Sequence, residues 1–273
     1  MNNAGANNSV GAAATSIISK LITVAIIILA IFAVYYLYQY LFRSVTVSSV
    51  TLLGGRREAN PTAPIVVNAK DMVPLYEGGE FTISMWIYIT NWSTRQNMNK
   101  HILSIGGSNY DTIRVYLDGV KNTLRVKMHM KEAGSPTNSN TDLARSNYTS
   151  TFSTQVVSSE QTDGQPGSCD VGDIDLQRWV SVIIAVNGKT CDTYIDGKLA
   201  RSCVMPTFYK VDGNAYTAKL LDLGGFGGYI SNVEMASSAL NPDAVYKKYM
   251  AGPEPISDIM AWLKSIFEPA KRN

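Results

Sequence analysis

The chain has 273 residues, of which 17% are charged and 45% are hydrophobic, and its formal net charge is +2. This length allows a large domain with a buried core. A nearly neutral charge without a basic cluster excludes nucleic acid as an expected partner.

The N-terminal region is divided into a polar head and an apolar segment. Residues 1–19 carry no charged side chain, so we expect a disordered head. Residues 21–42, LITVAIIILAIFAVYYLYQYLF, could span a bilayer core of roughly 30 Å as a helix. A cleaved signal peptide has a shorter apolar region ending in small residues, whereas this one ends in tyrosines typical of a membrane interface. We predict an uncleaved single-pass transmembrane helix over 20–43, anchored by Leu21, Ile26, Ile31, Tyr36, Tyr40 and Phe42.

Two features bear on the orientation of this segment. Arg43, Arg56 and Arg57 follow it, and the positive-inside rule then places the C-terminal domain on the cytosolic side. Glycosylation sequons at Asn91 and Asn147 would instead matter only in a lumenal domain. Because sequons are frequent by chance in such a composition, we expect the cytosolic orientation.

Strand-like runs begin directly after the apolar segment. Each is rich in β-branched or aromatic residues and is bounded by turn residues. We expect strands over 44–53, 64–69, 80–90, 101–107, 112–118 and 123–130. Residues 133–168 are rich in Ser, Thr, Asn and Gly and predict a long loop, with one short strand near Thr154–Ser158.

The next region predicts a three-stranded antiparallel meander over 178–186, 189–195 and 198–204. Asn187-Gly188 and Asp196-Gly197 supply the positive φ angles of tight hairpin turns. Strand-like runs at 218–225 and 228–235 follow, and then a short helix over 242–250 that has Asn241 as its N-cap. About a dozen strands with regular turns predict an all-β sandwich.

The three cysteines, Cys169, Cys191 and Cys203, cannot all pair with one another. In the register set by the Asp196-Gly197 turn, Cys191 faces Ser202, so a bridge from Cys191 to Cys203 would require a bulge. We therefore expect free thiols and a reducing compartment.

Three motifs carry a resemblance to a known family. LQRWVSVIIAV with TYIDGKLARS, FGGYISNVEMASSALNPDAVYKKY and FTISMWIYI resemble, in order and spacing, strands and the closing helix of laminin-G-like, concanavalin A-like jelly rolls. The resemblance implies a two-sheet jelly-roll sandwich over residues 44–252. Trp86 and Trp179 would be core anchors of such a sandwich.

Members of this superfamily include glycosidases, lectins, calcium-dependent adhesion modules and structural domains, so the fold alone does not fix the function. The glycosidase branch needs paired carboxylates in a Glu-x-Asp pattern, which the chain lacks. We therefore expect no catalytic residues, no enzyme activity and no cofactor.

Several other residues are candidate ligand contacts. Asp170, Asp173 and Asp175 are the candidate calcium ligands, with Asp118 or Asp222 as helpers, but a solvated acidic loop explains them more simply and we expect no metal. For His101 and His129 we expect ordinary half-buried strand positions. Tyr194 and Trp92 could stack on a sugar, although strand aromatics more often belong to the core.

The C-terminal region, 253–273, changes to a helical period. Its apolar stripe predicts an amphipathic helix that caps its own sheet, docks on a partner protein or, least favoured, lies on a membrane. We assign partner binding to Ile256, Ile259, Met260, Trp262, Leu263, Ile266 and Phe267.

Two functions are consistent with these observations. The first is a non-catalytic, membrane-anchored structural protein similar to minor capsid proteins of large DNA viruses, linking an internal virion membrane to the shell and binding capsid proteins. The second is a surface-displayed lectin that binds a glycan. Modified sequons would favour the lectin, and reduced cysteines would favour the structural protein.

Overall fold

The computed structural model describes residues 20–34, 36–37, 48–131, 143–156, 167–213 and 216–253. Contacts divide the chain into two units, Met1–Thr46 and Val47–Asn273. The predicted partner-binding residues between 256 and 267 lie outside the described residues, so their assignment stays a prediction.

In the N-terminal unit, residues 20–34 and 36–37 are helical. Leu21, Ile26, Ile31 and Tyr36 lie on this helix with exposed side chains, whereas Tyr40 and Phe42 are outside the described residues. No helix within the described part of the chain is both long enough and apolar enough to cross a bilayer. The transmembrane helix over 20–43 therefore stays a prediction.

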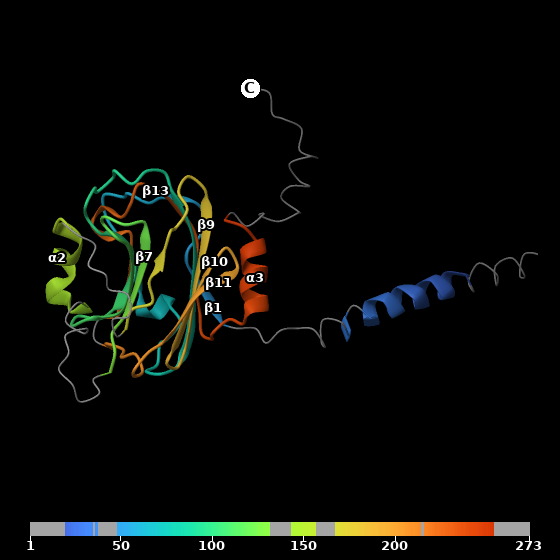
Figure 1. Cartoon of the computed structure of the whole chain (residues 1–273). Coiled ribbons are helices and arrows are strands. Elements are labelled where there is room, and N and C mark those ends of the chain that lie inside the picture. The colour runs from blue at the N-terminus through green and yellow to red at the C-terminus, as the bar shows by residue number, and fades with distance from the viewer. Residues whose placement is uncertain are drawn as a thin grey trace, which may run out of the picture. The chain divides into compact units, whose positions relative to one another are not determined.

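The second unit is a sandwich of two antiparallel sheets, as the sequence predicts (Figure 1). The seven-stranded sheet has the order β1-β13-β4-β9-β10-β11, with β2 paired to β13. Its strands are β1 Ser49–Leu53, β2 Arg57–Glu58, β4 Glu80–Ile89, β9 Trp179–Asn187, β10 Thr190–Ile195, β11 Lys198–Val204 and β13 Gly228–Ala236. The six-stranded sheet has the order β3-β12-β5-β6-β7-β8. Its strands are β3 Ile65–Asn68, β5 Lys100–Gly106, β6 Asp111–Leu117, β7 Thr123–Met128, β8 Val171–Gly172 and β12 Thr217–Leu220.

The core lies between the sheets and takes alternate residues from each strand. In β9, Val180, Val182 and Ile184 belong to this core, while Ile183 belongs to a separate cluster on the opposite face. Successive side chains of a strand point to opposite faces, which explains the alternation. The strands in the middle of the seven-stranded sheet therefore have packed side chains on both faces. The outer face is ordered by this packing in the same way as the inner face.

One helix lies over each outer face, with α3 beside the seven-stranded sheet and α2 beside the six-stranded sheet (Figure 1). α3, Pro242–Met250, is confirmed at its predicted place, and the Asn241 side chain accepts a hydrogen bond from the backbone N–H of Ala244.

α2, Tyr148–Ser153, was not expected, because a loop was predicted there. It forms because Tyr148 and Phe152 pack with Tyr116 of β6, a contact that local sequence does not reveal. The predicted short strand is absent at residues 154–156, and residues 157–158 lie outside the described range.

The prediction of three free thiols is wrong. Cys169 and Cys203 form a disulfide with a Cα–Cα distance of 5.8 Å, and only Cys191 is free. A register shift between Thr193 and Tyr194 sets Cys203 opposite Cys191, so Cys203 lies on the inner face of β11 rather than the outer one. There it reaches Cys169, which hydrogen-bonds to β7 through its backbone N–H, and the bridge joins the two sheets.

Candidate binding site

Three aromatic side chains lie side by side on the outer face of the seven-stranded sheet. Tyr229 of β13 is the cross-strand partner of Tyr88 of β4, and Tyr88 is the partner of Trp179 of β9. The ring centroids are 6.2 Å apart for Tyr229 and Tyr88 and 5.6 Å apart for Tyr88 and Trp179. We call these three residues the aromatic row. At about 4.8 Å per strand spacing the row is about 10 Å long.

The row is accessible and carries a positive charge at one end. Tyr229 is 37% exposed, and Tyr88 and Trp179 are half-buried. The exposed Arg56 places its guanidinium 5.0 Å from the centre of the Tyr229 ring, within the range of a cation–π interaction. The row can therefore make apolar stacking contacts and a hydrogen bond with the same ligand.

A glycine brings the strands of the row together. A Cβ atom at Gly228 would lie 1.9 Å from the backbone oxygen of Tyr88, so only glycine allows β13 to begin here. The next residue, Tyr229, is thereby held beside Tyr88. The sequence contains this signal as the Gly-Gly-Tyr of the closing strand, which was interpreted only as a fold motif.

The expectation that Trp86 and Trp179 anchor the sandwich core is wrong. Both lie on the outer face of the seven-stranded sheet. Trp179 belongs to the aromatic row, and Trp86 stacks on Tyr249 of α3 at a centroid distance of 5.8 Å. The core is filled instead by aliphatic residues, by methionines and by the aromatic residues Phe81, Tyr209 and Phe226. The error arose because strands covered on both faces give no sequence signal that separates inner from outer positions.

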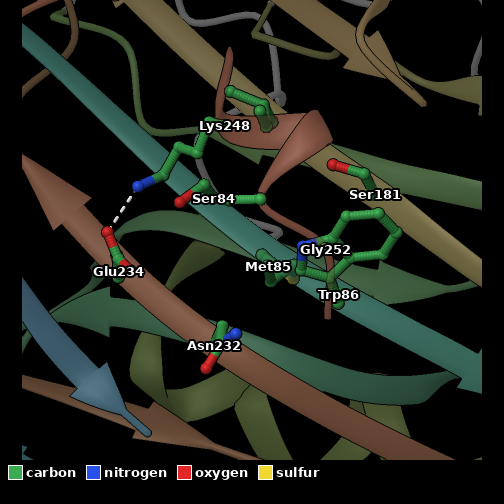
Figure 2. Close-up of a pocket in the computed structure, with 10 residues that line it drawn as sticks. Ser84, Met85, Trp86, Ser181, Asn232, Glu234, Lys248 and Gly252 are labelled. Carbon is green, nitrogen blue, oxygen red and sulfur yellow. Dashed lines mark hydrogen bonds and ion pairs between the residues drawn. The ribbon is translucent and has the colours of Figure 1, made fainter. Parts of the chain in front are cut away.

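A pocket of about 110 Å³ lies on the same face, between the sheet and the end of α3 (Figure 2). β4, β9 and β13 form its floor, and the residues after α3 form one wall. Its lining residues are Ser84, Met85, Trp86, Ser181, Ile183, Asn232, Glu234, Lys248, Ala251 and Gly252.

A bulge in β13 closes the pocket at one side. Asn232 has a φ of 46° at the point where the register of β13 shifts against β4, a conformation that asparagine tolerates well. Its side-chain amide donates to the backbone oxygen of Pro253, 2.7 Å away, and the hydroxyl of Ser231 donates to the same oxygen. The chain after α3 is thus fixed against the sheet beside the pocket.

The candidate calcium ligands do not form a metal site. Asp170 and Asp118 do come together, but the guanidinium of Arg125 lies between them at 2.7 Å from each carboxylate. Asp175 pairs with Arg178, and Asp173 is exposed. Within the described residues no group of three His, Cys, Asp or Glu side chains could hold a metal ion.

Three of the four remaining candidates are buried inside the domain, and Trp92 is half-buried. His101 and His129 are more buried than expected, at 1% and 9% exposure. Tyr194 is buried in a small cluster with Val245 of α3, and Trp92 packs against the main core, with the Lys100 ammonium 4.4 Å from its ring centre. His101, His129 and Tyr194 therefore offer no free surface for stacking on a sugar, and the half-buried Trp92 already has a cation over its ring.

Residues 64–246 match Laminin_G_3, a family described as the concanavalin A-like lectin/glucanases superfamily. The chain belongs to this family. Solved structures similar to this laminin-G-like domain include the HCR/D F1240A mutant, with a TM-score of 0.50, 12% identity and coverage of 76% of this chain and 47% of that one. The botulinum neurotoxin serotype D binding domain has a TM-score of 0.48, 13% identity and coverage of 76% and 47%.

The family match shows the fold, and the structure with the TM-score of 0.50 agrees with it. The laminin-G-like chain spans less than half the length of the structures that it matches. No protein with curated annotation shows significant similarity to it.

Proposed function

We propose that the domain is a non-catalytic, lectin-like module that binds a glycan on the aromatic row. The observation that carries the proposal is the alignment of Tyr229, Tyr88 and Trp179 on three adjacent strands with accessible rings. Sugar rings present a face of C–H groups that stacks on aromatic rings, and their hydroxyl groups accept hydrogen bonds from a guanidinium such as Arg56. The length of the row matches two linked sugar rings.

The cysteines support display of the domain in an oxidising environment. A disulfide persists in secreted and lumenal proteins and is rare in the cytosol. Cys169–Cys203 therefore favours the lectin over the structural protein, for which reduced thiols were expected. The two sequon asparagines, Asn91 and Asn147, are exposed, so both are compatible with N-glycosylation. We accordingly propose that the domain lies on the lumenal or exterior side, opposite to the side that the flanking arginines indicate.

Glycan binding by the full-length protein in detergent tests the proposal. We expect the wild-type protein to bind a subset of an immobilised glycan panel. Trp179→Ala should weaken this binding by about tenfold or more, the loss expected on truncating a central aromatic contact. Tyr76→Ala is the matched control, because Tyr76 is 70% exposed and lies outside the row. Absence of any glycan binding, or equal losses in both variants, would refute the proposal.

The structural role in a virion is a second candidate, favoured by the apolar segment at 21–42 and the apolar stripe at 256–267. In this role the protein would link an internal membrane to the shell, with the stripe docked on a capsid protein. Deleting 254–273 should then leave the melting temperature of the domain unchanged while the protein is lost from purified particles. A lower melting temperature with normal incorporation would mean that the segment caps its own sheet.

A further inference from the structure

The pocket beneath the end of α3 contains a polar group for which the described part of the chain offers no hydrogen-bond partner. Ser84 is 5% exposed, and its hydroxyl has no hydrogen-bond partner within the described residues. Buried hydroxyl groups are usually paired, because an unpaired one costs about 1–3 kcal/mol. In Figure 2 this hydroxyl lies at the pocket between β4 and α3. An external group that accepts a hydrogen bond would satisfy it.

The size of the pocket limits what that group can be. The pocket volume is about 110 Å³, and an apolar protein cavity of about 150 Å³ holds a benzene ring, which has six carbon atoms. Sites for whole small molecules begin at about 300 Å³. A complete sugar ring is therefore too large, whereas a substituent of about four non-hydrogen atoms fits.

The charges of the pocket favour a neutral substituent. Glu234 and Lys248 form an ion pair across its edge, so neither charge is left to attract an ionic group (Figure 2). Asn232 is also occupied, since its amide donates to Pro253 and its carbonyl oxygen accepts from the backbone N–H of Gly55. A carboxylate or phosphate would enter without a counter-charge, which is unfavourable in a partly buried site.

The remaining lining is apolar on the side of the strands and of α3. Trp86, Ile183 and Ala251 contribute to it, next to the Ser84 hydroxyl. A group with a methyl at one end and a carbonyl oxygen at the other matches this division. The acetamido group has four non-hydrogen atoms, no charge and both of these features.

The pocket lies within reach of a sugar bound on the aromatic row. Trp86, which lines the pocket, lies two residues before Tyr88 in β4. Ser181, which also lines it, lies two residues after Trp179 in β9. All four side chains point to the same face of the sheet. Two residues along a strand correspond to about 7 Å. A sugar ring beside the row could therefore direct a substituent into the pocket.

We infer that the pocket receives the acetamido group of an N-acetylated sugar, with the Ser84 hydroxyl donating a hydrogen bond to its carbonyl oxygen. This inference rests on the proposed function, because the aromatic row holds the sugar ring. It assigns the ligand class as glycans containing N-acetylhexosamine.

Two trisaccharides that differ only at C2 provide the test. N,N′,N″-Triacetylchitotriose, called chitotriose below, carries an acetamido group at C2 of each ring, where cellotriose carries a hydroxyl. We expect the full-length protein in detergent to bind chitotriose at least tenfold more tightly by calorimetry. Ala251→Leu, which fills the pocket, and Ser84→Ala, which removes the donor, should both reduce this preference to less than threefold and leave the cellotriose affinity unchanged.

The outcomes separate the inference from the proposed function. Equal affinity of the wild-type protein for the two trisaccharides, or a preference that survives in both variants, overturns the inference alone. Binding only of glycans that lack N-acetyl groups also overturns it alone, and the pocket then holds water. Failure to bind any glycan overturns both. A thermal melt of each variant verifies that it is folded, and loss of Ser84's unpaired hydroxyl should not lower the melting temperature.

Discussion

The outer faces of the two sheets are each covered by a helix, but the side chains beneath the helices differ in kind. Under α2, the six-stranded sheet carries charged groups that are buried and paired, such as Arg114 with Asp111 at 2.6 Å. Beside α3, the seven-stranded sheet carries the accessible, uncharged aromatic row. A paired buried charge must lose its partner before it can bind anything else, whereas an exposed ring needs only to displace water. The second face is therefore the one suited to recognition.

The charged face is held together by a connected network. Asp111 also contacts Arg145 at 3.1 Å, and the guanidinium of Arg114 lies 5.0 Å from the ring of Tyr148 in α2. The Tyr148 hydroxyl donates to Asp222, whose backbone N–H donates to His101 Nδ1. The network thus fixes α2 to the sheet and serves stability.

Breaking the charged face should have the largest effect. Arg114→Met removes the guanidinium that donates two hydrogen bonds to Oδ2 of the completely buried Asp111, and of the two guanidinium partners described for this carboxylate only Arg145 remains. Removing one member of a buried pair costs about 3–5 kcal/mol of unfolding free energy. Chemical denaturation measures the loss. Lys247→Met is the control, because its ion pair with Asp243 is exposed and worth less than about 1 kcal/mol. A loss below about 1 kcal/mol for Arg114→Met would contradict the structural role.

Removing the bond between the two sheets should have the next largest effect. The Cys169–Cys203 bridge closes a segment with a sequence separation of 34, for which chain entropy predicts about 3–4 kcal/mol. We expect Cys203→Ser to lose that amount in a denaturant titration. Cys191→Ala should leave the bridge intact. Burial raises the pKa of the Cys191 thiol to about 12, so this residue should also resist alkylation in the folded protein.

The stability of the domain should depend on pH through His101, which lies on the charged face. Complete burial, followed by the charges of Arg114, Lys219, Arg145 and Arg95, holds the pKa of this imidazole well below its ordinary 6.5. The unfolded chain therefore binds a proton near pH 6.5 that the folded chain does not. Stability should decrease as the pH falls below 6.5, by up to about 1.4 kcal/mol per unit.

The variant His101→Asn isolates this contribution, because its amide oxygen can still accept the bond from Asp222. Denaturation at several pH values between 7.5 and 5 should give a shallower slope for the variant. The same slope in both proteins would mean that His101 is not the group responsible.

The smallest effect on stability is expected in the aromatic row. Trp179 is half-buried on the outer face, so Trp179→Ala should cost only about 1–2 kcal/mol, below the 3–5 kcal/mol of a buried tryptophan. Ile184→Ala, on the inner face of the same strand, should cost more, about 2–5 kcal/mol. Melts of the two variants measure the difference. A larger loss for Trp179→Ala would place this residue in the core after all.

The positions of the strands and of α3 could be predicted from the sequence better than the sheet face to which each side chain points. The meander of β9, β10 and β11 was found because its two hairpin turns have local chemistry, and α3 because Asn241 and Pro242 mark its start. The orientation of Trp179 was not found, because β9 is apolar on both faces and its alternation is hidden. α2 was missed since its contacts with β6 are made across a long sequence separation.

The disulfide and the pocket depend on irregularities that are equally hidden. The register shift before Tyr194 sets the position of Cys203, and the bulge at Asn232 shapes one wall of the pocket. Bulges are set by the packing of several strands rather than by a local pattern. The role of Ser84 could not be predicted, because the sequence does not show whether the hydroxyl of a strand serine has a hydrogen-bond partner.

The positions of β1 and of the disulfide determine how the domain would respond to mechanical load. β1, the first strand after the N-terminal segment, is an edge strand that pairs only with β13, while the disulfide secures β11 at the opposite edge. If the protein is held by its N-terminal segment while a ligand is pulled away, the tension passes first into β1. We expect β1 to detach from β13 before the strands that carry the aromatic row separate. The unfolding of β1 would then absorb the extension while the ligand stays bound.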